Sequence, residues 1–179
     1  MTWRQLLIKL AERSAGEALA VFDEFDGGAI GVEEFVGLIA RGVTIYNLRA
    51  TGLADVALAG LLTARLKRPV LPVGIEPPDD LERLTEAART LNAALDATPD
   101  PRARVARLAR SEPLTAAQRA YGEAMAASPH VSGWRRGLSP AACQLCRWWA
   151  RDGRVFPADH PMPHHKGCTC TPIPITEGA

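Results

Sequence analysis

All four cysteines of the chain lie between positions 143 and 170. Two form Cys143-Gln-Leu-Cys146, and two follow a histidine in His165-Lys-Gly-Cys168-Thr-Cys170. A Cys-x-x-Cys turn brings two thiolates to one side of a tight bend, and a second pair about twenty residues later can close a tetrahedral site. The first twenty residues lack the organisation of a secretory signal, so the clustering favours metal binding over disulfides.

More ligands are available than a four-coordinate ion needs. The predicted ligands are Cys143, Cys146, His165 and Cys168, with Cys170 as the main alternative. His160 and His164 are weaker candidates. Thiolate and imidazole ligands favour zinc over magnesium or calcium. A site closed by four protein ligands has no open position for water or substrate, so the predicted zinc ion is structural.

Aromatic residues surround the predicted site. They are Trp134, Trp148, Trp149 and Phe156. We interpret them as the core of a segment too small to fold without metal, although tryptophans beside arginines could also stack on nucleic-acid bases. Asp152-Gly153 predicts a hairpin turn between Cys146 and Val155.

The elements that must position this site are predicted to be mainly α. Apolar residues recur at three- and four-residue steps over residues 3–24 and again from Val32 towards Arg65, where Gly42 and Gly52 could bend the second helix. Further helices are predicted from Asp79 or Asp80, as the cap, to about Leu95, from Thr98 to about Arg110, and from about Leu114 to Ala127.

We therefore predict a mainly α fold in which a helical N-terminal region precedes a small C-terminal Cys/His zinc knuckle with a short β-hairpin. The predicted divisions are an N-terminal helical hairpin (1–68), a Pro-rich linker (69–78), a helical region (79–130) and a zinc-knuckle module (131–175). The prolines of the linker cannot continue a helix.

Charge is distributed unevenly along the chain. Residues 1–100 hold 10 basic and 15 acidic residues, whereas residues 101–179 hold 11 and 5, so the second part is basic. This asymmetry suggests nucleic acid or an acidic protein as a partner, with an ordinary solvated surface as the alternative. The predicted contacts are Arg104, Arg107, Arg135 and Arg136.

Other chemistry has little support in the sequence. We find no Gly-rich phosphate loop, nucleophile elbow or zinc-protease helix motif, so we expect no enzyme and no small-molecule substrate. No apolar run is long enough to span a bilayer, and we expect no membrane partner.

The C-terminal motifs also occur in a distinctive order. They are Arg107-x-x-Arg110-Ser111-Glu112, Ala120-Tyr121-Gly122-Glu123-Ala124, Gly133-Trp134-Arg135-Arg136, Cys143-x-x-Cys146, Asp152-Gly153-Arg154-Val155-Phe156 and His165-x-x-Cys168-x-Cys170-x-Pro172. This succession, over about residues 104–175, resembles the MuF-like minor head proteins of tailed bacteriophages. The chain departs from the family pattern at Ser111, where Thr is usual, at Gly122, where Asn is common, and at Thr169, where Arg is frequent.

The resemblance implies a structural minor capsid (head morphogenesis) protein, made in the host cytoplasm and located in the virion at the portal vertex or capsid interior. Its implied partners are the portal or major capsid protein and packaged DNA. It carries the zinc ligands onto Cys143, Cys146, His165 and Cys168, with Cys170 as the alternative. Two other classes stay open: a zinc-knuckle nucleic-acid-binding protein, and a metal-dependent hydrolase or effector.

Overall fold

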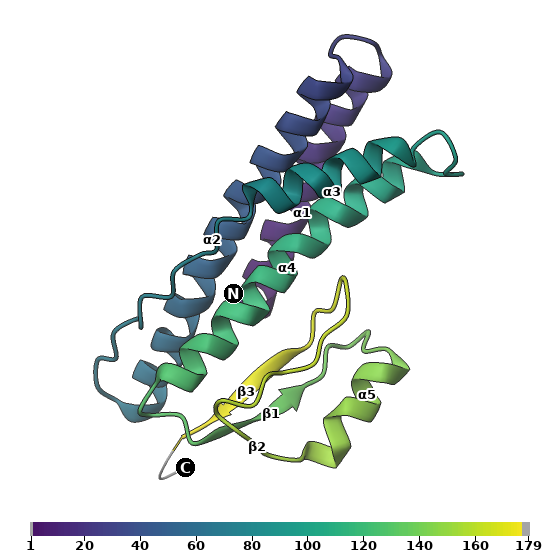
Figure 1. Cartoon of the computed structure of the whole chain (residues 1–179). Helices are drawn as coiled ribbons and strands as arrows, with labels where there is room; N and C mark the ends of the chain where they lie inside the picture. Colours follow the sequence, from purple (N-terminus) through teal and green to yellow (C-terminus); the bar gives the residue numbers. More distant parts are fainter. Residues whose placement is uncertain (1, 177–179) are drawn as a thin grey trace.

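The structure of the chain, a computed structural model, describes residues 2–176 (Figure 1). A helical body comprises α1 (Trp3–Asp26), α2 (Val32–Leu66), α3 (Leu81–Ala93) and α4 (Pro101–Ala127). α4 packs against both α1 and α2, and α3 lies against α2. A small three-stranded sheet and the Cys/His cluster follow. The predicted fold class, mainly α with a small C-terminal Cys/His module, is confirmed.

The first helix follows its sequence pattern closely. Thr2 and Gln5 form a reciprocal cap, in which the Gln5 N–H donates to Thr2 Oγ1 at 3.3 Å and the Thr2 N–H donates to Gln5 Oε1 at 2.8 Å. The predicted apolar stripe is buried, and it consists of Leu7, Ala11, Ala15, Ala18 and Phe22. The chain then turns at Gly28, whose φ of 74° lies in the left-handed region that favours glycine.

The second helix is continuous over 35 residues and runs through Gly42 and Gly52 without interruption. Its buried side chains contribute to both apolar clusters of the body. In one cluster Ala50 and Ala54 lie with Leu7 of α1, and in the other Phe35 lies with Phe22. Burial along this whole length explains why the intrinsic helix penalty of two glycines does not divide α2.

The prediction of two separate helices between residues 98 and 127 was wrong, because α4 is a single helix of 27 residues that passes through Pro113. A proline cannot donate the hydrogen bond to the carbonyl of residue i−4, which here is Ala109. Pro113 is, however, fully buried, and the helix on either side of it buries Val105, Ala109 and Ala117 in the core. Tertiary packing therefore compensates for one missing backbone hydrogen bond.

The proline-containing segment between α2 and α3 is non-helical, as its composition indicated, and one buried carboxylate fixes it. Asp55 of α2 accepts hydrogen bonds from the backbone N–H groups of Val73 at 2.9 Å, Gly74 at 2.7 Å and Ile75 at 3.1 Å. Asp55 is only 5% exposed. The middle of this segment is thus attached to α2 by three hydrogen bonds.

The start of α3 differs in detail from the expected cap. Asp80 occupies the N-cap position, but its carboxylate accepts hydrogen bonds from the side chains of Asn47 at 3.1 Å and Arg83 at 3.0 Å instead of capping the helix. The Leu81 N–H donates to Asp79 Oδ1 at 3.4 Å. Asp80 therefore joins the start of α3 to α2.

The C-terminal module (residues 131–175) contains β1 (Gly133–Gly137), the short helix α5 (Gln144–Ala150), β2 (Phe156–Pro157) and β3 (Thr171–Ile175). The strands form an antiparallel sheet in the order β2-β1-β3, with Trp134 opposite Phe156 on one side and Pro174 on the other. Gly133 permits the close approach of β2, because a Cβ there would lie 2.5 Å from the Phe156 carbonyl oxygen.

Asp152-Gly153 is not the hairpin turn that the sequence suggested. The two residues lie in a 3-10 turn (Arg151–Gly153) directly after α5, and Asp152 and Gly153 have positive φ angles of 54° and 85°. The segment before them is helical, so no strand is available there for a local hairpin. Both strand partners of β1 come from later in the chain.

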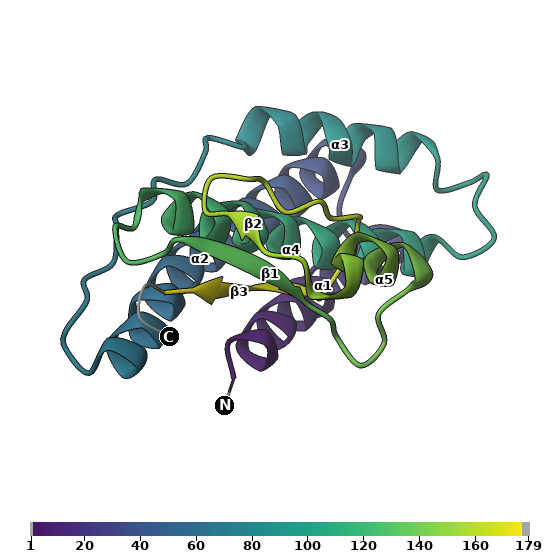
Figure 2. The same ribbon diagram turned by 90° about the horizontal axis from the view of Figure 1, so that it is seen from below.

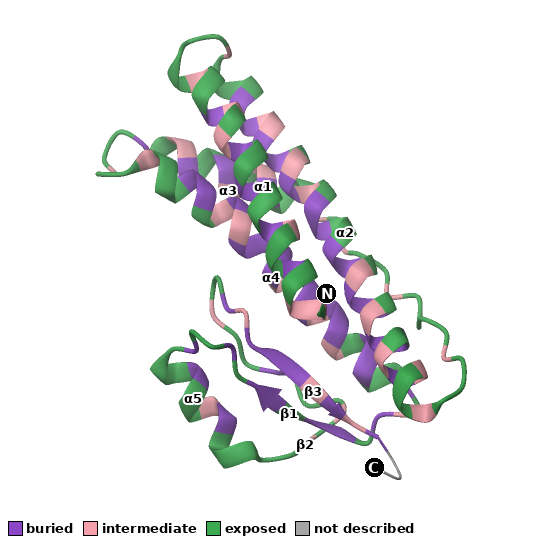
Figure 3. Cartoon of the chain, turned by 180° about the vertical axis from the view of Figure 1, so that it is seen from behind, coloured by how far each residue is buried: buried purple, intermediate pink, exposed green. Residues whose placement is uncertain are grey.

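The sheet is attached to the helical body through β3 and the end of β1. Figures 1 and 2 show the sheet beside α4, with α5 beyond it on the far side from the helices. Arg4 of α1 donates to the Gly137 carbonyl at 3.3 Å, and Arg65 of α2 donates to the Pro174 carbonyl at 2.5 Å. Figure 3 shows that most of β1 and β3 is buried, whereas α5 is largely exposed. No helix within residues 2–176 is both long and apolar enough to cross a membrane.

Candidate metal centre

Two short segments form the candidate metal centre, which we define as Cys143, Cys146, His165, Cys168 and Cys170. Cys143 is the N-cap residue of α5 and Cys146 lies in its first turn. The other three residues belong to the loop that enters β3. In this loop the Cys168 N–H donates to the His165 carbonyl at 3.0 Å, and Gly167 has a φ of 75°, which closes a tight turn.

The ligand atoms of these residues lie close together. Nε2 of His165 is 3.2 Å from Sγ of Cys143 and 3.3 Å from Sγ of Cys146, and the Cys146 and Cys168 sulfur atoms are 3.5 Å apart. No described cysteine forms a disulfide. The ligand atoms form two groups, in each of which they lie within 4.8 Å of one another. One group is Cys143, Cys146 and His165, and the other is Cys146, Cys168 and Cys170, so Cys146 belongs to both.

These distances suit a shared metal ion. Around a tetrahedral zinc ion, bonds of about 2.0–2.3 Å place neighbouring ligand atoms about 3.5–3.8 Å apart. The observed separations are slightly shorter, and small outward movements of the side chains would match them. Each of the two groups that share Cys146 is therefore close enough to hold a metal ion. Of the predicted ligands, Cys143, Cys146 and His165 lie in one group, and Cys168 lies with Cys146 and Cys170 in the other.

The histidine presents the correct nitrogen to the sulfur atoms. Nδ1 of His165 lies 3.1 Å from the Lys166 carbonyl oxygen, which can only accept a hydrogen bond. This contact places the proton on Nδ1 and leaves the lone pair of Nε2 facing Cys143 and Cys146. His160 and His164 lie outside the cluster: the His160 ring stacks on Phe156 at 4.9 Å, and Nδ1 of His164 lies 3.4 Å from the Met162 carbonyl oxygen.

The cysteines differ in acidity. The backbone N–H of Cys146, with a smaller contribution from His165, lowers the pKa of Cys143 to about 7. Burial and the neighbouring Cys168 and Cys170 thiols raise the pKa of Cys146. Burial alone would raise the pKa of Cys170, but hydrogen bonding with the backbone N–H and the hydroxyl of Ser139, together with Cys146 and Cys168, outweighs burial and lowers that pKa. The centre thus combines one acidic exposed thiol with a buried thiol that ionises less readily.

Arg136 was predicted to contact a partner at the surface, but it is buried beside the cysteines and is only 5% exposed. Its guanidinium lies 3.7 Å from Sγ of Cys146, donates to the Pro163 carbonyl and covers the Trp149 ring at 5.2 Å from the centroid. A buried cation here offsets thiolate charge. Arg136 therefore supports the centre and is not available to a partner.

Gln118 was not identified from the sequence, and it connects α4 to the metal centre. Its buried side-chain amide donates to the carbonyl oxygens of Cys168 at 2.6 Å and Cys170 at 3.2 Å. A signal was present, because Gln118 is a polar residue between Leu114 and Tyr121 on the buried stripe of α4. A polar side chain at such a position needs a buried partner.

The aromatic residues divide between core and surface. Trp134 is fully buried, stacks on Phe156 at 4.7 Å between centroids, and donates from Nε1 to the His160 carbonyl at 2.8 Å. Trp148 is 74% exposed, so the interpretation of all these aromatic residues as core was wrong for Trp148. It lies on the exposed face of the short helix α5, which packs against β1 through its other side.

The remaining predicted contact residues lie at the surface in two different places. Arg135 is exposed on β1, in the C-terminal module. Arg104 and Arg107 are exposed on α4 and line a cleft of the helical body.

Comparison of the chain with protein-family models, with curated proteins and with solved structures found no match.

Proposed function

We propose that this chain is a structural protein of a tailed-phage head, of the MuF-like minor capsid class, whose C-terminal module is held together by one zinc ion. One observation supports this proposal above the others: the segments that carry the resemblance pack as a single unit. Gln118 of α4 binds the loop that carries Cys168, and Trp134 of β1 packs on Phe156 of β2. Motifs that act together in a family are expected to meet in the fold.

Zinc is the metal that this donor set favours, because thiolates and imidazole bind it better than they bind hard cations. Four of the five ligands would complete its coordination and leave no position for substrate. The ion would therefore act as a structural link between α5 and the loop before β3. The neighbouring Arg136 would balance part of the charge that several thiolates bring to the site.

The helical body would also contribute to a structural role in a phage particle. The long helices α1, α2 and α4 pack into one helical body, and the metal would fix the small module that is attached to its side. Such a protein would bind the portal or the major capsid protein inside the virion, with packaged DNA as a further contact. The acidic N-terminal part and the basic C-terminal part offer different surfaces to these partners.

The zinc proposal is tested by metal analysis of protein purified without added metal, together with urea unfolding before and after a strong chelator. We expect about one zinc ion per chain, and chelation should selectively unfold the C-terminal module. Cys146→Ser, which removes the residue shared by both groups, should abolish binding, whereas Ser132→Ala on the module surface should not. Metal-free protein that is as stable as the untreated protein would refute the zinc site.

The head assignment needs a separate measurement. Particles purified from a culture that carries the gene in its natural setting should contain the chain in a few copies per head, by quantitative mass spectrometry. A nonsense codon in place of Trp134 should reduce infectivity or DNA content. Particles that lack the chain, and that form with normal DNA content in the nonsense mutant, would contradict the assignment.

A second candidate function is nucleic-acid binding by α5. Trp148 is 74% exposed, and Arg147, Arg151 and Arg154 are exposed nearby in sequence. An exposed tryptophan among arginines can stack on a base while the cations contact phosphates. Quenching of tryptophan fluorescence by a single-stranded oligonucleotide, lost in Trp148→Ala and weakened by salt, would favour this function. Unchanged fluorescence would exclude it.

A further inference from the structure

We propose that the cleft between α3 and α4 binds an acidic peptide segment of a partner protein that inserts one apolar side chain. The cleft has a volume of about 610 Å³, which is in the range of ligand sites. It lies between the helical body and the loop of the metal centre, because Lys166, the residue after His165, forms part of its wall. This inference does not depend on the identity of the metal or on the head assignment.

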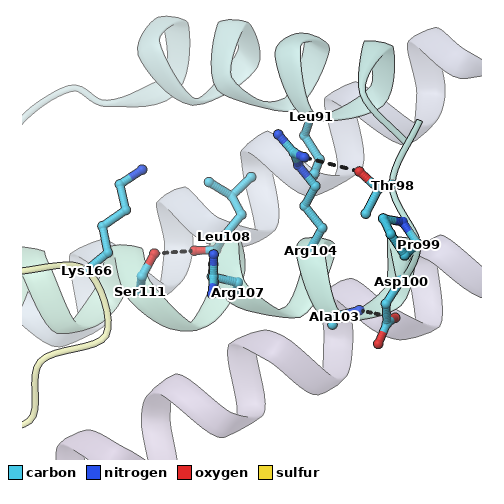
Figure 4. Close-up of a pocket in the computed structure, with 10 residues that line it drawn as sticks. All are labelled: Leu91, Thr98, Pro99, Asp100, Ala103, Arg104, Arg107, Leu108, Ser111 and Lys166. Carbon is cyan, nitrogen blue, oxygen red and sulfur yellow. Dashed lines mark hydrogen bonds between the residues drawn. The ribbon is translucent and has the colours of Figure 1, made fainter. Parts of the chain in front are cut away.

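Three cationic side chains line the cleft, and they are Arg104, Arg107 and Lys166. Figure 4 shows Arg104 near the Thr98 end and Lys166 at the other end, with Arg107 and Leu108 between them. Arg104 donates to Thr98 Oγ1 at 3.1 Å. Within the described part of the chain, none of the three cations forms an ion pair.

Neighbouring arginines on the same helix are neutralised. Arg110 forms a two-point ion pair with Glu12 of α1, with both N–O distances 2.8 Å, and Arg102 is paired with Asp23 of α1. α4 thus has paired arginines next to α1 and unpaired arginines in the cleft. The charge left uncompensated is positive, so the complementary occupant is an anion.

The one carboxylate in the cleft wall is already engaged. Asp100 is the N-cap of α4, and its Oδ1 accepts the Ala103 N–H at 2.9 Å. Its charge also lies at the positive end of the helix dipole. It therefore does little to neutralise Arg107 and Lys166 further along the cleft.

The apolar residues that line the cleft favour one class of anionic partner, an acidic peptide, over nucleic acid. They are Leu91, Pro99, Ala103 and Leu108, and no aromatic side chain lines the cleft. Single-stranded nucleic acids use aromatic platforms for stacking, which this cleft does not offer. An acidic peptide fits better, because its carboxylates can bind the arginines while an apolar side chain covers the floor.

The test selects peptides from a random displayed library on the metal-loaded wild-type protein, with counter-selection on Arg104→Glu/Arg107→Glu. Enriched sequences should place Asp or Glu residues around an apolar residue. A synthetic peptide of that sequence should bind the double variant on the order of tenfold or more weakly than wild type. Arg135→Glu/Arg151→Glu, which makes the same charge change at exposed positions outside the cleft, should lose less than about threefold, because salt screens distant charges.

Three outcomes would overturn the proposal. Enriched peptides without an acidic excess would remove the charge argument, and equal loss in both double variants would indicate nonspecific attraction. Binding of a single-stranded oligonucleotide that only the cleft variant loses, without peptide binding, would assign the cleft to nucleic acid. Circular dichroism checks that each variant is folded. The milder double variant Arg104→Gln/Arg107→Gln should also bind the acidic peptide more weakly than wild type, with a smaller loss of affinity than the glutamate variant.

Discussion

The side-chain amide of Gln118, in the middle of α4, donates a hydrogen bond of 2.6 Å to the backbone carbonyl of Cys168. The same amide reaches the Cys170 carbonyl at 3.2 Å. One buried side chain of the helical body thus fixes the path of the loop that supplies most of the candidate ligands. The metal centre therefore depends on the body that supports it as well as on its own cysteines.

Gln118→Leu should weaken the metal centre without unfolding the helices. Leucine has a similar size but leaves both carbonyl oxygens buried without a donor, which costs about 1–3 kcal/mol. We expect metal affinity to fall on the order of tenfold, as for other residues that orient ligands. A chelator competition measures this, and Gln144→Leu on the exposed face of α5 is the control. Equal metal affinity in wild type and Gln118→Leu would contradict the role of Gln118.

Trp134 should be the most important packing residue of the C-terminal module. Trp134→Ala removes a fully buried indole that stacks on Phe156, and should destabilise the module by about 3–5 kcal/mol. Trp134→Phe keeps an aromatic ring but leaves the His160 carbonyl without its donor, so an intermediate loss is expected. Urea unfolding measures both. Trp148→Ala, at an exposed position, should change stability by less than about 0.5 kcal/mol.

Asp55 should control the segment between α2 and α3. Asp55→Asn replaces one carboxylate oxygen with a donor, so at least one of the N–H groups of Val73, Gly74 and Ile75 loses its acceptor. The expected cost is about 2–3 kcal/mol, with faster proteolysis within residues 69–78. Glu76→Gln, which changes an exposed carboxylate of the same segment, is the matched control. Equal proteolysis rates in the two variants would show that the hydrogen bonds to Asp55 do not stabilise this segment.

Alkylation of the metal-free protein should depend on pH in a residue-specific way. The pKa of Cys143 is lowered from 9.0 to about 7, chiefly by the backbone N–H of Cys146. The thiolate is the reactive form, so iodoacetamide should modify Cys143 slowly below this pKa and rapidly above it, with a midpoint of about 7. The pKa of Cys146 is raised, so Cys146 should stay a protonated, slow-reacting thiol over the same range.

Peptide mapping by mass spectrometry follows the modification of each cysteine. Metal-loaded protein should resist alkylation at Cys143 because the thiolate is then a ligand. A single midpoint near 9 for Cys143, or equal rates for Cys143 and Cys146, would disprove the difference in acidity.

Local sequence patterns determined the helices and the composition of the metal centre. The stripe from Leu7 to Phe22 predicted α1 because helical periodicity is a property of neighbouring residues, and the structure buries that stripe. The Cys143-x-x-Cys146 and His165-x-x-Cys168 spacings likewise placed candidate ligands on two tight turns. The contacts between these turns, Cys143 with His165 and Cys146 with Cys168, join residues 22 positions apart and depend on the tertiary fold.

Tertiary structure decided how these parts meet. Pro113 continues α4 because the helix is buried on both sides of it, and Arg136 supports Cys146 because the strand that carries it faces the centre. The sheet joins Gly133 to both Pro157 and Ile175, and such pairing depends on the closure of long loops and not on local propensity. The partners of Asp55 and Gln118 are equally remote in sequence, so only the packed chain could specify them.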